Sequence, residues 1–161
     1  DVHVSSLSKG LGCFGGYVAS SARTVELLIN TSKQFIYTSA LPEHLCVAAG
    51  EAMKLAKRGN HQSKLNINIA FLKTRLVEIG FTIGNSSSQI IPIMIGREDI
   101  ALEFSEELLK RGVFVQPVRY PTVKKGSARL RLSVSAAHTR EQLSKALEVL
   151  RAVGKTQKIV D

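Results

Sequence analysis

Lys9 stands between three serines and four glycines near the start of the chain, in the stretch "SSLSKGLGCFGG" (residues 5–16). Two kinds of chemistry use such residue types. In the first, Gly10, Gly12 and Gly15 form a G-x-G-x-x-G loop that holds a dinucleotide. In the second, the Lys9 amine forms a Schiff base with the aldehyde of a cofactor, and the neighbouring hydroxyl groups hold a phosphate.

The context of the glycines argues against the dinucleotide loop. That loop requires a helix at its third glycine and an acidic residue about 20 positions later. Here the third glycine precedes "GYVASS", which is typical of a strand, and residues 33–35 are Lys, Gln and Phe. Nicotinamide binding stays a remote alternative. From residue types alone, Lys9 as an ordinary solvated surface charge also stays open.

The elements that position these residues follow from periodicity and from turn residues. Apolar residues at helical spacing, Leu65, Ile69, Leu72 and Leu76, predict a helix that Gly80 ends. Thr139 can cap the last helix, although Glu141 does not stand at the capping-box position. The expected strands cover 1–6, 15–21, 88–96, 113–119 and 128–135. The expected helices cover the segment from 22, then 43–57, 61–79, 97–112 and 139–155.

We expect two parts, residues 1–58 and residues 59–161. The order of strands and helices in the second part predicts a small sheet with helices on one face. The first part has too few strands to close a sheet of its own, so we expect the chain to be the C-terminal part of a larger subunit.

Composition excludes several classes of function. The net charge is +9, but Lys and Arg are scattered as singles and pairs without a nucleic-acid-binding motif. No apolar run approaches the ~20 residues of a membrane helix, and the first residues do not resemble a secretory signal. Two cysteines are too few for a zinc site. We therefore expect a cytoplasmic protein without nucleic-acid, membrane or metal partners, whose ligands could include coenzyme A esters.

Three ordered motifs resemble the α-oxoamine synthases: "SLSKGLGCFGG" at 6–16, "FIYTSALP" at 35–42 and "RYPTVKKGSARLRLSVSAAHT" at 119–139. The resemblance implies an α/β fold, that of the fold-type-I, aspartate aminotransferase-like transferases that use pyridoxal 5'-phosphate (PLP). Residues 1–58 would then be the end of the large PLP-binding domain, and residues 59–161 the small C-terminal α+β domain.

The resemblance also implies roles for individual residues. Lys9 would be the catalytic lysine that bonds the cofactor, and Ser6 would donate to the cofactor phosphate. Thr38 and Ser39 would hold the phosphate of the partner subunit's cofactor, which implies a homodimer with shared active sites. For these hydroxyl groups, strand-end or turn hydrogen bonding stays the alternative.

Two further residues are implied to bind substrate. Thr122 matches a substrate-contacting threonine. Arg131 would bind the substrate carboxylate, because strand alternation places Arg129 and Arg131 on one face and a guanidinium offers a bidentate fork. A solvated strand face is the alternative for Arg131, and we expect Arg129 to have a structural role.

The implied reaction is the decarboxylative condensation of an amino acid with an acyl-CoA. "PTV" at 121–123 is most similar to the biotin-biosynthetic branch, which implies L-alanine and pimeloyl-CoA, whereas Tyr120 and Lys124 depart from that pattern. Sister activities that use glycine or serine stay open, as does a non-catalytic scaffold subunit. Lys124 and Lys125 could contact CoA phosphates or belong to a solvated loop.

Overall fold

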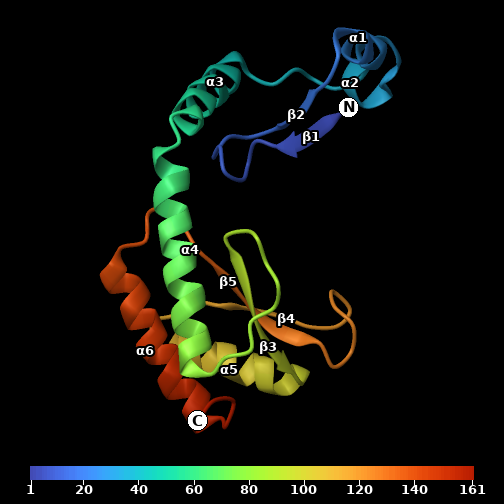
Figure 1. Ribbon diagram of the computed structural model, residues 1–161. Helices are drawn as coiled ribbons and strands as arrows, with labels where there is room; N and C mark the ends of the chain where they lie inside the picture. Colours follow the sequence, from blue (N-terminus) through green and yellow to red (C-terminus); the bar gives the residue numbers. More distant parts are fainter. The chain divides into compact units, whose positions relative to one another are not determined.

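The computed structural model describes residues 1–161, which divide into two compact units, Asp1–Asn60 and His61–Asp161. Figure 1 shows a hairpin and helices in the first unit, and a small sheet with helices in the second. The division lies two residues beyond the expected boundary. The assignment of the units to a large and a small domain stays a prediction.

A β-hairpin begins the first unit. β1 (His3–Ser6) pairs antiparallel with β2 (Gly16–Ala19), and Ser6 stands opposite Gly16. β-branched and aromatic residues favour the strands, and the glycines between them allow the chain to turn. Both expected strands are confirmed, each shorter than predicted.

Three helices follow the hairpin: α1 (Ala22–Thr31), α2 (Lys33–Ile36) and α3 (Glu43–Lys57). Ser21 caps α1, because its hydroxyl oxygen accepts from the Thr24 N–H at 3.3 Å. Leu7 and Ala49 are the buried apolar residues of this unit, whereas Phe14, Leu27 and many other large apolar side chains are exposed. The first unit therefore buries little apolar surface within itself.

The second unit is a sheet covered by helices. Its elements are α4 (Asn60–Ile79), β3 (Ile90–Gly96), α5 (Glu98–Lys110), β4 (Gln116–Val118), β5 (Ala128–Ser133) and α6 (Arg140–Thr156). The strand order is β3-β5-β4, and both pairs are antiparallel, so β5 is central.

One face of this sheet forms the core. Ile91 and Ile93 of β3 and Leu130 of β5 are fully buried, and they belong to the same cluster as residues of α4, α5 and α6. Burial of each such side chain contributes about 1.5–3 kcal/mol. The predicted arrangement, helices on one face of a small sheet, is confirmed. The other face is called the open face, and its residues are Pro92, Met94, Gln116, Val118, Arg129 and Arg131.

The start of α6 shows a contact that the sequence interpretation missed. The Thr139 hydroxyl oxygen accepts from the Gln142 N–H at 3.2 Å, and the Gln142 side-chain oxygen accepts from the Thr139 N–H at 2.9 Å. This is a complete capping box. The expectation concerns Glu141 alone, but the amide oxygen of Gln142, three residues after the cap, supplies the acceptor.

None of the helices combines the length and the apolar character that a membrane crossing requires.

Candidate active site

Lys9 lies in the loop that connects β1 to β2, and backbone hydrogen bonds fix this loop. The N–H of Leu7 donates to the Gly15 carbonyl, and the N–H of Cys13 donates to the Leu7 carbonyl, both at 2.9 Å. The Gly12 N–H donates to the Lys9 carbonyl at 3.1 Å and closes a tight turn. The Lys9 side chain is exposed, so the loop presents an amine on a well-defined backbone.

Glycine occurs at these positions of the loop for different physical reasons. Gly15 has φ +110°, and a Cβ at that position would stand 2.7 Å from a methyl carbon of Leu41. A Cβ at Gly10 would have no neighbour within 4 Å, so there is open space beside Lys9. Gly16 begins β2 rather than a helix. The dinucleotide alternative is therefore wrong, because its phosphate would have no helix N-terminus to bind.

Two hydroxyl groups lie directly before Lys9. The Ser6 and Ser8 hydroxyl oxygens are 2.6 Å apart, and the Ser6 oxygen also accepts from the Ser8 N–H at 3.2 Å. A hydroxyl group has one proton and two lone pairs. One hydroxyl group of the pair can therefore donate to the other, and the second O–H can still donate to a phosphate oxygen of a ligand.

Thr38 and Ser39 lie in the irregular segment between α2 and α3. The Thr38 hydroxyl donates to the Ser39 carbonyl at a long 3.4 Å, and both residues are exposed. Pro42 stands at the N-cap of α3 without a side-chain cap, so neither hydroxyl group caps that helix. The closeness of Leu41 to Gly15 brings this segment next to the Lys9 loop within the first unit.

Arg131 lies on the open face of the sheet in the second unit. It stands opposite Pro92 on β3 and opposite Gln116 on β4, and its side chain is exposed. The four ion pairs of the chain do not include it. Arg129 is half-buried, and its Nε–H donates to the Ser127 carbonyl at 3.1 Å, which agrees with the structural role expected for it.

Thr122 lies in the loop between β4 and β5, residues 119–127. Its N–H donates to the Arg119 carbonyl at 3.0 Å. Together with Lys124 and Arg129 it lines a cavity of about 540 Å³. The structure thus places the two predicted substrate residues on one sheet and on the loop that adjoins it.

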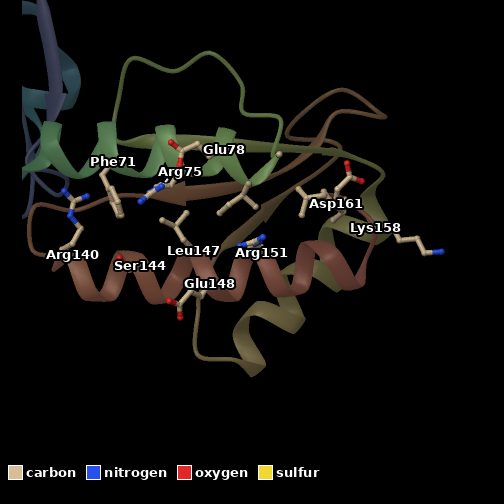
Figure 2. A pocket seen from close by; sticks show the side chains of 14 residues that line it. Phe71, Arg75, Glu78, Arg140, Ser144, Leu147, Glu148, Arg151, Lys158 and Asp161 are labelled. Atoms are coloured by element: carbon tan, nitrogen blue, oxygen red, sulfur yellow. Dashed lines mark hydrogen bonds and ion pairs between the residues drawn. The ribbon is translucent and has the colours of Figure 1, made fainter.

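A groove of about 870 Å³ lies elsewhere in the second unit, between α4 and α6. Figure 2 shows Phe71 on its wall, and the Arg140 guanidinium carbon lies 3.7 Å from the centre of the Phe71 ring. None of the predicted site residues lines this groove. Sequence reasoning did not find this groove, because its two walls, α4 and α6, are far apart in the chain.

The perturbed ionisable groups belong to surface ion pairs of α5. A hydrogen bond from Arg97 lowers the pKa of the Asp99 carboxyl below its ordinary value, and a hydrogen bond from Lys110 lowers the pKa of the Glu107 carboxyl. All four side chains are on one helix or beside it, and they do not contact the candidate site residues.

Curated relatives match the chain along nearly its whole length. The 8-amino-7-oxononanoate synthase of Citrifermentans bemidjiense is 39% identical over 99% of this chain and 42% of that protein. The 8-amino-7-oxononanoate synthase 1 of Bacillus velezensis is 39% identical over 99% of this chain and 41% of that protein. The chain spans about two fifths of the length of these relatives.

Solved structures of similar fold also match nearly the whole chain. A structure of SPT with its PLP internal aldimine has a TM-score of 0.93 and 28% identity, over 99% of this chain and 41% of that chain. The 8-amino-7-oxononanoate synthase of Francisella tularensis has a TM-score of 0.83 and 27% identity, over 98% of this chain and 46% of that one. The predicted fold-type-I α/β fold is confirmed.

The expected resemblance to the α-oxoamine synthases is also confirmed by these relatives. The family model of class I and II aminotransferases matches residues 1–150. With this match over nearly the whole sequence, and with the same fold in the solved relatives, the chain belongs to the aminotransferase class I and II family.

Proposed function

We propose that this chain carries the cofactor lysine and the substrate-carboxylate site of an 8-amino-7-oxononanoate synthase. The reaction condenses L-alanine with pimeloyl-CoA and gives 8-amino-7-oxononanoate, CoA and CO₂ in cytoplasmic biotin biosynthesis. The observation that carries the proposal is Lys9, exposed on a hydrogen-bonded loop beside paired hydroxyl groups, in a chain whose curated relatives have that name.

The residues present fit PLP. An exposed amine, open space at Gly10 and the Ser6–Ser8 hydroxyl pair suit an aldehyde and a phosphate. When bound, PLP supplies an electron sink that stabilises negative charge on the amino-acid Cα. Lys9 would bond the cofactor, release it to the incoming amino acid, and then accept the proton from Cα as a general base. Ser6 would hold the phosphate oxygens.

The other residues orient the substrates. The Arg131 guanidinium would bind the amino-acid carboxylate, which fixes the direction of Cα. Thr122 would contact the substrate from the loop between β4 and β5. Thr38 and Ser39 would donate to the cofactor phosphate of a partner subunit, so a homodimer would contain two shared sites.

A second candidate is a sister activity that uses serine or glycine. It is favoured by one observation: structures of serine palmitoyltransferase, such as that of Sphingomonas wittichii, match 100% of this chain at a TM-score of 0.92. Steady-state kcat/KM of the holoenzyme with alanine, glycine and serine against several acyl-CoAs decides between them. A value for serine or glycine above that for alanine would contradict our assignment of the amino acid.

Borohydride trapping tests the cofactor lysine directly. Reduction of the holoenzyme is expected to attach the cofactor to the peptide that contains Lys9, because reduction converts the lysine–cofactor bond to a stable amine. Lys9→Arg keeps the positive charge and is expected to give no labelled peptide. Peptide mass spectrometry provides the measurement. A label on a different lysine would contradict the assignment, and no label on the wild type would favour the non-catalytic scaffold.

A further inference from the structure

The excess of positive over negative charge arises largely in one segment, because acidic residues are absent from it. Residues 108–140 contain no Asp or Glu. Their basic residues are Lys110, Arg111, Arg119, Lys124, Lys125, Arg129, Arg131 and Arg140. The net charge of the whole chain is +9, so this segment carries most of the excess. Such a region attracts anionic ligands.

The cavity at the β4–β5 loop lies within this segment. Lys124 and Arg129 bring positive charge to its lining, Thr122 and Ser127 bring hydroxyl groups, and no carboxylate lines it. The Lys125 ammonium lies 5.2 Å from the centre of the Tyr120 ring. Such a cation–π contact places this second ammonium beside Tyr120, which itself lines the cavity.

Lys124, Lys125 and Arg129 take part in none of the four ion pairs of the chain. The four ion pairs use Lys54, Arg75, Arg97 and Lys110 as their cations, and none of these lies in the β4–β5 loop. Ammonium groups beside hydroxyl groups, without a carboxylate, are suited to a phosphate. A cation would be repelled by this lining, and an uncharged sugar would make no use of its positive charge.

The β4–β5 loop lies beyond the start of the strand that carries Arg131. In an acyl-CoA thioester, the extended pantetheine arm separates the reacting carbonyl from the phosphate groups. Arg131 and the first residue of β5, Ala128, are three residues apart, or about 10 Å along the strand. Figure 1 shows the β4–β5 loop projecting beyond the sheet. Lys124 and Lys125 therefore lie away from the carboxylate site and on the same side of the sheet end as Thr122.

We propose that the β4–β5 loop is a phosphate subsite for the coenzyme A part of the acyl donor, with Lys124 and Lys125 as its binding cations. The inference rests on the proposed function, because it names the part of the site that recognises the acyl donor. The basic residues of the loop would then bind a ligand rather than only contact solvent.

Equilibrium binding to the holoenzyme tests the subsite without turnover. Isothermal titration calorimetry compares CoA, dephospho-CoA and phosphate-free pantetheine on the wild type and on Lys124→Gln/Lys125→Gln. The variant is expected to bind CoA about tenfold more weakly, because two charge-assisted contacts are lost, and to bind pantetheine as the wild type does. Dephospho-CoA lacks the 3'-phosphate but keeps the diphosphate, so its affinity relative to CoA shows which of the two groups the loop binds.

A matched variant, Lys145→Gln/Lys155→Gln, removes two exposed charges from α6 in the same unit and is expected to leave CoA affinity unchanged. Equal CoA affinity for the loop variant and the wild type would overturn the subsite while acyl-CoA turnover keeps the proposed function. Weaker binding of pimeloyl-CoA but not of free CoA would also overturn it, since the loop would then recognise the acyl carboxylate. A wild type that neither binds CoA nor turns over acyl-CoA would overturn both proposals.

Discussion

Arg131 projects from the central strand of a three-stranded sheet, onto the face that carries no helix. Its neighbours across the strands are Pro92 and Gln116, and neither carries a charge that could compete for a carboxylate. The side chains that stabilise β5, such as Leu130, point to the opposite face. The proposed carboxylate contact of Arg131 can therefore be tested by substitution with little effect on the stability of this strand.

We expect Arg131→Lys to raise the KM for the amino acid about 10- to 100-fold, because an ammonium group cannot reproduce the bidentate pair. The KM for the acyl-CoA is expected to change little. Steady-state kinetics provide the measurement, and Arg151→Lys on the surface of α6 is the control. Unchanged amino-acid saturation in the Arg131 variant would remove it from the carboxylate role.

At the scale of single residues, the sequence was sufficient to place Lys9 in a loop between two strands and Arg131 on one face of a strand. Residue type and a spacing of two along a strand carry that information. The opposing residues Pro92 and Gln116 could not be predicted, because register depends on pairing between segments that are distant in the chain. The hydrogen bonds that fix the Lys9 loop likewise depend on backbone geometry.

Among the elements, α6 begins with a complete capping box, formed by Thr139 and Gln142. We expect Thr139→Ala to lower the free energy of unfolding by about 1 kcal/mol, since a cap hydroxyl is lost. Thr139→Ala and Gln142→Ala are expected to be non-additive, because each side chain bonds to the backbone of the other. Urea denaturation of the four forms of this cycle provides the measurement.

The control for this cycle is Glu141→Ala, which lies between the two capping residues without joining the box. Its effect is expected to add to that of Thr139→Ala. Coupling with Glu141 as strong as with Gln142 would show that the first turn acts through charge near the helix dipole rather than through the reciprocal hydrogen bonds.

Most elements were predicted within a few residues, and the differences have local causes. The strand expected at 113–119 is limited to Gln116–Val118. At one end the Val113 N–H donates to the Leu108 carbonyl of α5, and at the other the Arg119 carbonyl accepts from the turn at Thr122. These backbone groups are engaged in a helix end and a turn, so they cannot continue the ladder.

For the whole molecule, the proposal of shared sites in a homodimer makes a test by mixing possible. We expect subunits with Lys9→Ala, co-assembled with subunits carrying Thr38→Ala and Ser39→Ala, to regain activity. Each mixed dimer would contain one site with intact Lys9 and intact hydroxyl groups. Random assembly of equal amounts of a two-fold dimer gives about one quarter of the wild-type sites.

Activity of the mixture relative to each variant alone provides the measurement, and separately purified dimers combined without subunit exchange are the control. Activity that does not exceed the sum of the two parent dimers would contradict the shared sites. It would leave the Lys9 assignment to the trapping experiment.

The division of β5 between two faces has a consequence for how such a protein can change over generations. Exposed substitutions generally alter stability by less than about 0.5 kcal/mol, whereas truncation of a buried leucine costs about 2–5 kcal/mol. Positions such as Gln116 and Lys124 can therefore vary at little cost to folding, while Leu130 and Leu132 cannot. Selection can therefore change the residues on one side of the sheet, and with them the ligands bound there, because the opposite side keeps the scaffold intact.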